Sequence, residues 1–207
     1  MITKEMLDYY MERTNKHISL VKDVFYKSYL KLDLHYTELL NLSDEIECHD
    51  KTKFSKELMF HYILITWNYK CIREGIDFII PNNIAMEMTK ATELHCKLEK
   101  HHPEYWSSQT NVVNPDNRDV PLKCINVTNM NKLSMIQMVI DWCAVSIERN
   151  NTPMSWFKSN LNVRWHFNED QVQFINKMID IFWRPYAKMV RNNIRRKRIR
   201  WFKSLQR

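Results

Sequence analysis

The sequence contains a single glycine, Gly75, among its 207 residues, and this scarcity limits the folds open to the chain. Tight hairpin turns often place glycine at positive φ, because glycine lacks the side chain that clashes there. A hairpin-rich β architecture is therefore disfavoured. The glycine-rich loops that hold phosphate in P-loop and dinucleotide-binding proteins are excluded, so any phosphate chemistry must use metals or basic side chains.

Apolar residues instead recur at the spacing of amphipathic helices along most of the chain. The pattern predicts helices over residues 3–30, 34–48, 56–71, 83–101, 129–147 and 169–182. Ser55 and Asn168 are expected to cap two of these helices, and Pro103 to end the fourth near His102. The polar segment 107–128 is expected to be a loop or lid. The sequence thus predicts a single all-α helical bundle.

Positive charge is concentrated at the C-terminal end of the chain. Residues 184–207 carry ten lysines and arginines and no acid, whereas the 183 residues before them carry 21 basic and 24 acidic side chains. The protein is therefore a near-neutral domain with a basic end rather than a basic protein. We predict one domain over residues 1–183, followed by a basic C-terminal helical tail over residues 184–207.

The cysteines and the hydropathy of the chain bear on its compartment. The five cysteines form no Cys-x-x-Cys pair, and no run of the sequence approaches the roughly 18 apolar residues of a membrane span. The sequence also starts without a recognisable signal peptide. These features predict a cytoplasmic or other intracellular protein without a transmembrane segment.

The stretch HDKTKFS, residues 49–55, places an imidazole beside a carboxylate and adds a cation three residues later. His49 and Asp50 suit a divalent first-row ion but cannot hold it alone, so other helices must supply further ligands. Buried polar groups need partners, and a metal is a strong one. We predict that one metal site collects further side chains stranded among apolar neighbours, namely His17, His95, His101, His102 and Asp141.

Each of these residues also has a simpler interpretation. A lone histidine on an apolar face, such as His17, is commonly a hydrogen-bonded core residue, and His35, His61 and His166 are assigned to that class. Asp141 could be a buried carboxylate paired with an arginine. The metal hypothesis rests on the joint occurrence of an adjacent His-Asp pair, an adjacent His-His pair and an isolated aspartate on an apolar helix.

The order His, His-Asp, Asp resembles the HD-domain superfamily of metal-dependent phosphohydrolases. This resemblance implies an HD-domain-like helical bundle around one or two divalent ions, with a basic ligand set of His17, His49, Asp50 and Asp141. The letters HDKTK and the later His-His pair also resemble signatures of the subgroup that acts on cyclic dinucleotides, which implies that Lys53 contacts substrate phosphate. The glycine-tyrosine-proline element of that subgroup is missing from this chain.

Two longer motifs resemble a family of small proteins of unknown function from bacteria and phages. That family carries an early histidine, HD-x-(S/T)-K-F-S, a later A-x-x-x-H-x-x-x-N-x-HHPEYW and an Asp-Trp pair. The corresponding letters here are HDKTKFS at 49–55, ATELH at 91–95, EKHHPEYW at 99–106 and DW at 141–142. Glu99 stands where that family usually has asparagine. The resemblance spans roughly residues 15–145 and implies no substrate.

Together these features predict a metal-dependent phosphohydrolase that acts on a nucleotide or related phosphoester. The expected cofactor is one or two divalent ions (Mn, Fe, Zn or Mg), with His95, His101 and His102 holding the second. The expected catalytic residues are Asp50, Lys53 and Glu104, the last in proton transfer or in orienting a ligand. Tyr105 and Trp106 either stack on a base or belong to the core.

A rival hypothesis is a nucleic-acid-binding or interaction protein in which the histidine cluster is structural. The tail interleaves cations with aromatic residues, a pattern suited to phosphate contacts and base stacking. The residues assigned to this contact are Arg195, Arg196, Lys197, Arg198, Arg200, Trp201 and Lys203. The same pattern fits a solvated helix end, a localisation signal or binding to an anionic surface. A hydrolase domain with a basic tether would combine the two hypotheses.

Overall fold

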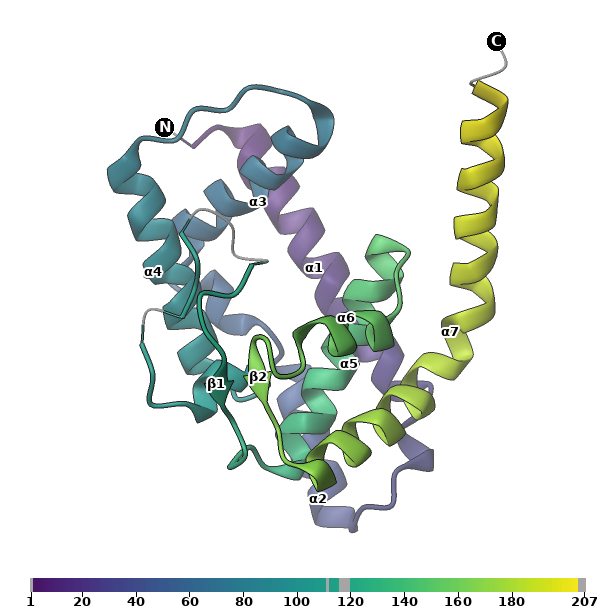
Figure 1. The fold of residues 1–207 in the computed structure, drawn as a ribbon. Coiled ribbons are helices and arrows are strands. Elements are labelled where there is room, and N and C mark those ends of the chain that lie inside the picture. The colour runs from purple at the N-terminus through teal and green to yellow at the C-terminus, as the bar shows by residue number, and fades with distance from the viewer. Residues whose placement is uncertain (1, 111, 116–119, 205–207) are drawn as a thin grey trace.

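The computed structural model describes residues 2–110, 112–115 and 120–204, with side chains described up to residue 196. Helices dominate these ranges, and the predicted all-α class is confirmed (Figure 1). The elements in chain order are α1 Lys4–Tyr26, η1 Tyr29–Lys31, α2 Tyr36–Glu47, η2 Lys51–Phe54, α3 Met59–Glu74, α4 Asn82–Leu98, η3 Pro103–Trp106, β1 Ile125–Asn126, α5 Lys132–Arg149, α6 Pro153–Asn160, β2 Trp165–His166 and α7 Glu169–Ser204.

Several helix boundaries differ from the prediction: α1 ends at Tyr26 rather than at residue 30, and the start of α3 and the end of α4 also differ. The expected cap of α3 by the Ser55 side chain is wrong, because α3 begins only at Met59 and follows a turn in which the carbonyl of Ser55 accepts the Met59 N–H at 2.9 Å. Helix α4 ends at Leu98 rather than near residue 101, and Glu99 is already extended with ψ 115°. His102 is extended too, as expected of a residue before proline.

The segment predicted as a loop or lid contains one short strand. Strand β1 pairs in parallel with β2, with Ile125 opposite Trp165. The pairing places the residues around Trp165 beside the turn that carries the His-His pair, although some 60 residues separate them in sequence. This pairing forms one wall of the cavity described below.

The core consists of two apolar clusters that share α1. One cluster includes Met6 and Tyr10 of α1 and packs against α3 and α4, while the other includes Val21 and Val24 of α1 and packs against α2, α5, α6 and α7. His17 lies on the same buried stripe of α1, between these two clusters. The polar site is therefore built where the two apolar clusters meet.

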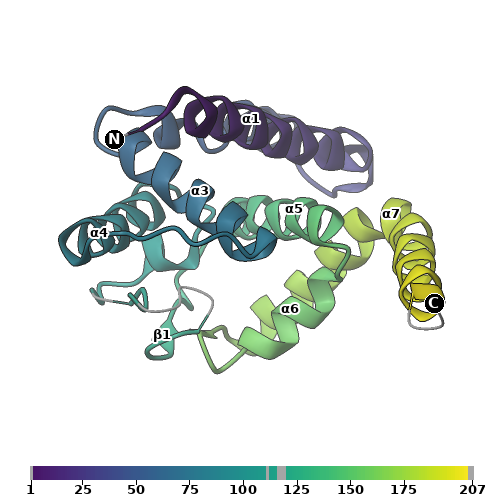
Figure 2. The ribbon, with the colours of Figure 1, turned by 90° about the horizontal axis from the view of Figure 1, so that it is seen from above.

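Helix α5 is the central element of the larger cluster. Eleven of its 18 residues are buried, and it contacts α1, α2, α6 and α7. Its start is set by Asn131, whose side chain accepts the Ser134 N–H at 2.9 Å. Viewed from above, α1 lies along one side of α3 and α5 (Figure 2). This arrangement brings Asp141 of α5 opposite His17.

Helix α7 begins at the predicted Asn168 cap, whose side chain accepts the Gln171 N–H at 2.9 Å. It crosses residues 183 and 184 without a break and contains Pro185, and Figure 1 shows that it bends and then projects away from the body. Tyr186 remains buried beyond the predicted domain boundary, and its hydroxyl donates to Asp23 at 2.8 Å.

Arg195 and Arg196 of the predicted nucleic-acid contact are exposed on this projecting part. The side chains of its other members lie outside the described residues, namely Lys197, Arg198, Arg200, Trp201 and Lys203.

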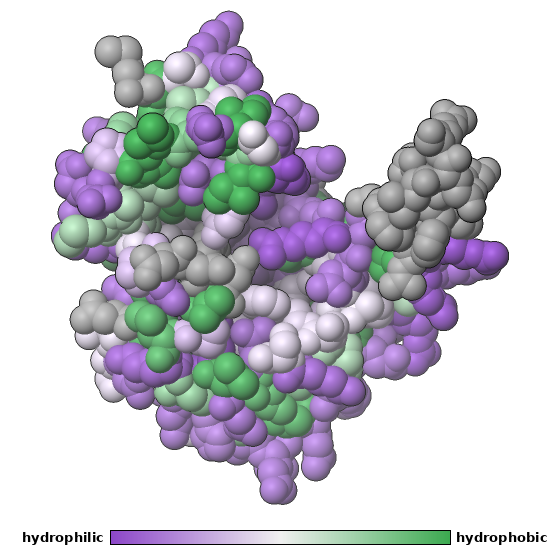
Figure 3. Space-filling model, turned by 45° about the horizontal axis from the view of Figure 1, so that its top comes forward, coloured by the Kyte–Doolittle hydropathy of each residue, from purple (hydrophilic) through white to green (hydrophobic). Residues whose placement is uncertain are grey.

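The face of the molecule drawn in Figure 3 is largely hydrophilic. Figure 3 shows polar side chains over most of one face, with apolar side chains gathered over the α3–α4 part of the molecule. All five cysteines are free thiols. Among the residues that the structure describes, no helix combines the length and apolar character needed to cross a membrane.

Candidate metal centre

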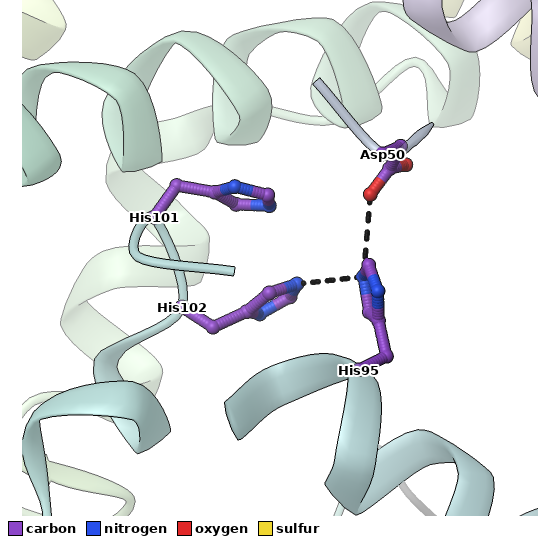
Figure 4. Close-up of side chains that lie close together, drawn as sticks. All are labelled: Asp50, His95, His101 and His102. Atoms are coloured by element: carbon purple, nitrogen blue, oxygen red, sulfur yellow. Dashed lines mark hydrogen bonds and ion pairs between the residues drawn. The ribbon is translucent and has the colours of Figure 1, made fainter. Parts of the chain in front are cut away.

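The structure brings all seven predicted ligand residues into one cluster. They come from α1, from the turn after α2, from α4 and the turn that follows it, and from α5. These residues are His17, His49, Asp50, His95, His101, His102 and Asp141. Figure 4 shows Asp50 and three of the histidines pointing toward one another. The proposal that four helical regions supply the site therefore matches the geometry.

Asp50 lies at the middle of the cluster. It adopts left-handed backbone geometry, with φ 59°, a conformation that aspartate tolerates better than most residues. Its Oδ2 lies 3.7 Å from His49 Nε2 and 3.8 Å from His17 Nε2, while its Oδ1 lies 3.2 Å from His95 Nε2. One buried carboxylate thus belongs to two groups of possible ligands, one on each side.

The first group is completed by an aspartate of α5. Asp141 Oδ1 lies 3.0 Å from His17 Nε2 and 3.8 Å from His49 Nε2, so its partners are imidazoles and the alternative of an arginine pair is wrong for the described residues. His17 Nδ1 lies 3.4 Å from Glu148 Oε2. Burial lowers the pKa of His17, but Asp141 and Glu148 outweigh burial and raise this pKa to about 9.

The second group contains the three histidines that follow in sequence. His95 Nε2 lies 3.1 Å from His102 Nε2, although α4 ends before His102 and the two residues are not on one continuous helix. His95 Nδ1 lies 2.9 Å from the hydroxyl of Thr52, which donates to Glu99 at 2.6 Å. Glu99, the departure from the family pattern, therefore helps to orient His95.

Two imidazoles in the cluster have buried nitrogens that form no hydrogen bond with the described residues. Both ring nitrogens of His49 and of His101 are shielded from solvent and form no hydrogen bond with the described residues. Burial lowers the pKa of both rings, so they are neutral and each presents a lone pair. An unsatisfied buried polar atom costs about 1–3 kcal/mol, and a bound cation removes this cost for the coordinating nitrogen. The donor set and these nitrogens fit a divalent metal.

Lys53 pairs with Asp50. Its Nζ lies 2.5 Å from Asp50 Oδ2 and 5.5 Å from the centre of the Tyr62 ring. Burial would raise the pKa of Asp50, but Lys53 and the nearby imidazoles hold it well below its usual value. Asp50 is therefore an anionic ligand candidate. The predicted contact of Lys53 with substrate phosphate stays a prediction.

A cavity of about 180 Å³ opens beside the cluster. Its lining includes His101, His102 and Asp141 at one end, together with Trp142, Trp156 and Trp165 and three cations, Lys123, Arg149 and Arg164. Lys53 is absent from the lining formed by the described residues. A cavity that borders a ligand cluster and is lined by cations and aromatic rings suits an anionic organic substrate.

Glu104 lines the same cavity and is buried rather than solvated. Its Oε1 accepts the indole N–H of Trp165 at 2.9 Å, and its backbone carbonyl accepts from Lys97 at 2.7 Å. In this arrangement Glu104 holds the cavity wall in place; its predicted part in proton transfer stays untested. Trp106 packs against the core, whereas Tyr105 is exposed, and neither lines the cavity.

Several residues that shape the site were missed from the sequence. Glu148 follows Asp141 by seven residues, which places both on one face of a helix, so this spacing could have identified it. Thr52 lies within HDKTKFS but was not assigned a role. Trp165 reaches the site only because β2 pairs with β1, and nothing in the residues next to it in sequence indicates this role. The prediction that His35 and His166 are core histidines is wrong, because both are exposed, and His61 is half-buried. All three lie outside the cluster.

Residues 6–181 match a family described as a family of unknown function (DUF5662), and the chain belongs to this family. The matched range includes every candidate ligand and ends before the basic part of α7. No curated protein and no solved structure matches the chain.

Proposed function

We propose that this member of the family is a metal-dependent phosphohydrolase acting on a nucleotide or a related phosphoester. The observation that carries the proposal is the position of Asp50, a buried anion shared by two groups of histidines, beside a cation-lined cavity that His101, His102 and Asp141 help to line. The resemblance to HD-domain phosphohydrolases supports the same reaction class.

The residues proposed to hold the metal fall into the two groups that share Asp50. His17, His49 and Asp141 complete one group, and His95, His101 and His102 complete the other. A bound divalent ion supplies Lewis acidity toward a phosphoryl oxygen and lowers the pKa of a bound water. The protein's own part is to keep Asp50 ionised through Lys53 and to orient His17 and His95 through Glu148 and Thr52.

The charge of the cavity favours an anionic substrate. Lys123 and Arg149 line it without a carboxylate partner among the described residues, and arginine suits phosphate because its guanidinium presents paired donors. The aromatic lining of the cavity offers flat surfaces for a base. A nucleotide satisfies both features.

The test combines metal analysis with turnover. Gently purified protein is expected to contain a stoichiometric divalent metal, and loading with Mn²⁺, Mg²⁺, Fe²⁺ or Zn²⁺ should support phosphate release from at least one member of a nucleotide panel. Asp50→Asn keeps a residue that tolerates left-handed geometry but removes the charge, and it should abolish release. His166→Asn, at an exposed histidine, is the matched control. Undiminished release by Asp50→Asn would refute the assignment.

A second candidate function, nucleic-acid binding, is favoured by the projecting end of α7. Arg191, Arg195 and Arg196 are exposed there, beyond the part of the helix that packs on the body. Phosphate contacts of this kind weaken steeply with salt. Deleting residues 191–207 should remove salt-sensitive binding of nucleic acid and spare phosphate release from small substrates. Equal nucleic-acid binding by the truncated protein would dismiss this role.

A further inference from the structure

The cavity extends from the candidate metal centre along one face of α5. Asp141, Trp142, Val145, Ser146 and Arg149 all line it. Their spacing of one, four, five and eight residues keeps them on one side of the helix. Eight residues rise about 12 Å along a helix, so the backbone of Arg149 lies about that far from the aspartate of the metal centre. The cavity is therefore long enough for more than one phosphoryl group.

The far end of the cavity is cationic. Arg149 is exposed there, and Lys123 and Arg164 line the same space. The two carboxylates of the lining are engaged elsewhere, Glu104 by Trp165 and Asp141 by His17. In the described part of the chain neither of them pairs with Arg149. A ligand anion therefore meets the Arg149 guanidinium at this end without displacing a carboxylate of the described residues.

Aromatic contacts hold a second guanidinium in place. The Arg164 Cζ lies 5.4 Å from the centre of the Trp165 ring and 5.8 Å from that of Trp156. Trp165 is itself fixed by Glu104 and by a stacked contact with Trp142, whose ring centre is 5.5 Å away. This ordering reduces the entropy lost when a ligand binds. The Arg164 side chain at the far end is therefore held in position by its neighbours, unlike a mobile cation on an open surface.

We propose that Arg149 and Arg164 form a subsite for a second phosphate group of the substrate. The inference rests on the proposed hydrolase function and names its substrate class: a phosphoester whose second phosphate is separated from the reacting one by a ribose, as in a nucleoside 3′,5′-bisphosphate. A guanidinium binds phosphate through two parallel N–H donors, which lysine cannot reproduce. A substrate with one phosphate uses only the metal end of the cavity.

The test compares two probes on metal-loaded full-length protein, adenosine 5′-monophosphate and adenosine 3′,5′-bisphosphate. The ratio of their kcat/KM values should favour the bisphosphate at least tenfold in the wild type. Arg149→Gln should bring this ratio close to one, and Arg164→Lys should lower it because the charge remains but the paired donors are lost. Arg13→Gln, at an exposed arginine of α1 outside the cavity, is the control and should keep the wild-type ratio.

The outcomes separate the subsite from the reaction. If both probes are turned over and the ratio is the same in wild type and Arg149→Gln, the subsite is wrong and the hydrolase function stands. If neither probe is turned over, the hydrolase function fails for these compounds, and calorimetric binding of adenosine 3′,5′-bisphosphate decides the subsite. Binding at least tenfold weaker in Arg149→Gln than in Arg13→Gln supports it, and equal affinity overturns it.

Discussion

Replacing Thr52 by valine tests whether the chain of hydrogen bonds behind His95 prepares the metal centre. The Thr52 hydroxyl donates to Glu99 at 2.6 Å, so its oxygen is left to accept the Nδ1–H of His95 at 2.9 Å. This assignment places the lone pair of His95 on Nε2, the atom that faces Asp50 and His102. Valine has nearly the shape of threonine but removes both contacts.

The expected loss has two parts. The substitution leaves His95 and Glu99 without their shared partner in a largely buried place, and such a loss costs about 1–3 kcal/mol of folding stability. Loss of a group that orients a metal-binding histidine typically lowers metal affinity 10–100-fold. That factor corresponds to about 1.4–2.8 kcal/mol of binding free energy.

The assay is a competition titration of Mn²⁺ or Zn²⁺ against a coloured chelator, with thermal unfolding of the metal-free protein measured in parallel. Thr52→Ser keeps the hydroxyl and should stay within about threefold of the wild-type affinity. Thr52→Val and Thr52→Ser with the same metal affinity would refute the orienting role, whatever the change in stability.

Three further predictions follow from the described contacts. First, Glu148→Gln removes the charge beside His17, so the pKa of this histidine in metal-free protein should fall from about 9; an NMR titration measures the shift, with the exposed Glu12→Gln as control. Second, His49, His101 and His102 have pKa values lowered by desolvation, so the unfolded state binds more protons below pH 6.5 and the stability contributed by these neutral rings is lost as pH falls. His101→Gln should make the loss between pH 6.5 and 5.5 smaller by about 1 kcal/mol in chelator-treated protein, and an unchanged loss would contradict the neutral state of this ring. The raised pKa of His17 has the opposite sign, because its contribution is complete below pH 6.5 and disappears as pH rises through 9, so it barely changes in this window. Third, Trp165→Phe removes the donor to Glu104 and should cost about 1–3 kcal/mol in urea unfolding, and a loss below about 0.5 kcal/mol would dismiss the proposed anchoring of the cavity wall.

The fold class was predictable because its signals are local. Helical periodicity and the predicted cap at Asn168 are properties of a few neighbouring residues, and this cap is present. The scarcity of glycine pointed to the right class, but left-handed positions do not depend on glycine alone. Asp50, Asn150 and Asn162 adopt positive φ as well as Gly75. Aspartate and asparagine accept this geometry, and one such position sets the direction of the central carboxylate.

The candidate ligands were also predictable, because polar residues stranded on apolar faces have few ways to be satisfied. Their separation into two groups that share Asp50 was not. That arrangement depends on the direction of each oxygen of Asp50, with Oδ1 toward His95 and Oδ2 toward His17 and His49. Sequence spacing gives the face of a helix but not the direction of a carboxylate after its end.

The far end of the cavity shows why the rest required a structure. In the sequence, Arg149 is an ordinary basic residue in the last turn of a helix, where cations are common in any protein. It becomes a candidate substrate contact only because β1 pairs with β2 and brings Trp165 and Arg164 into the cavity lining together with α5. Glu104 changes in the same way, from an acid near a helix end to the acceptor that fixes Trp165. Residues of this kind are defined by partners tens of positions away, so their chemistry can be inferred only after the chain is folded.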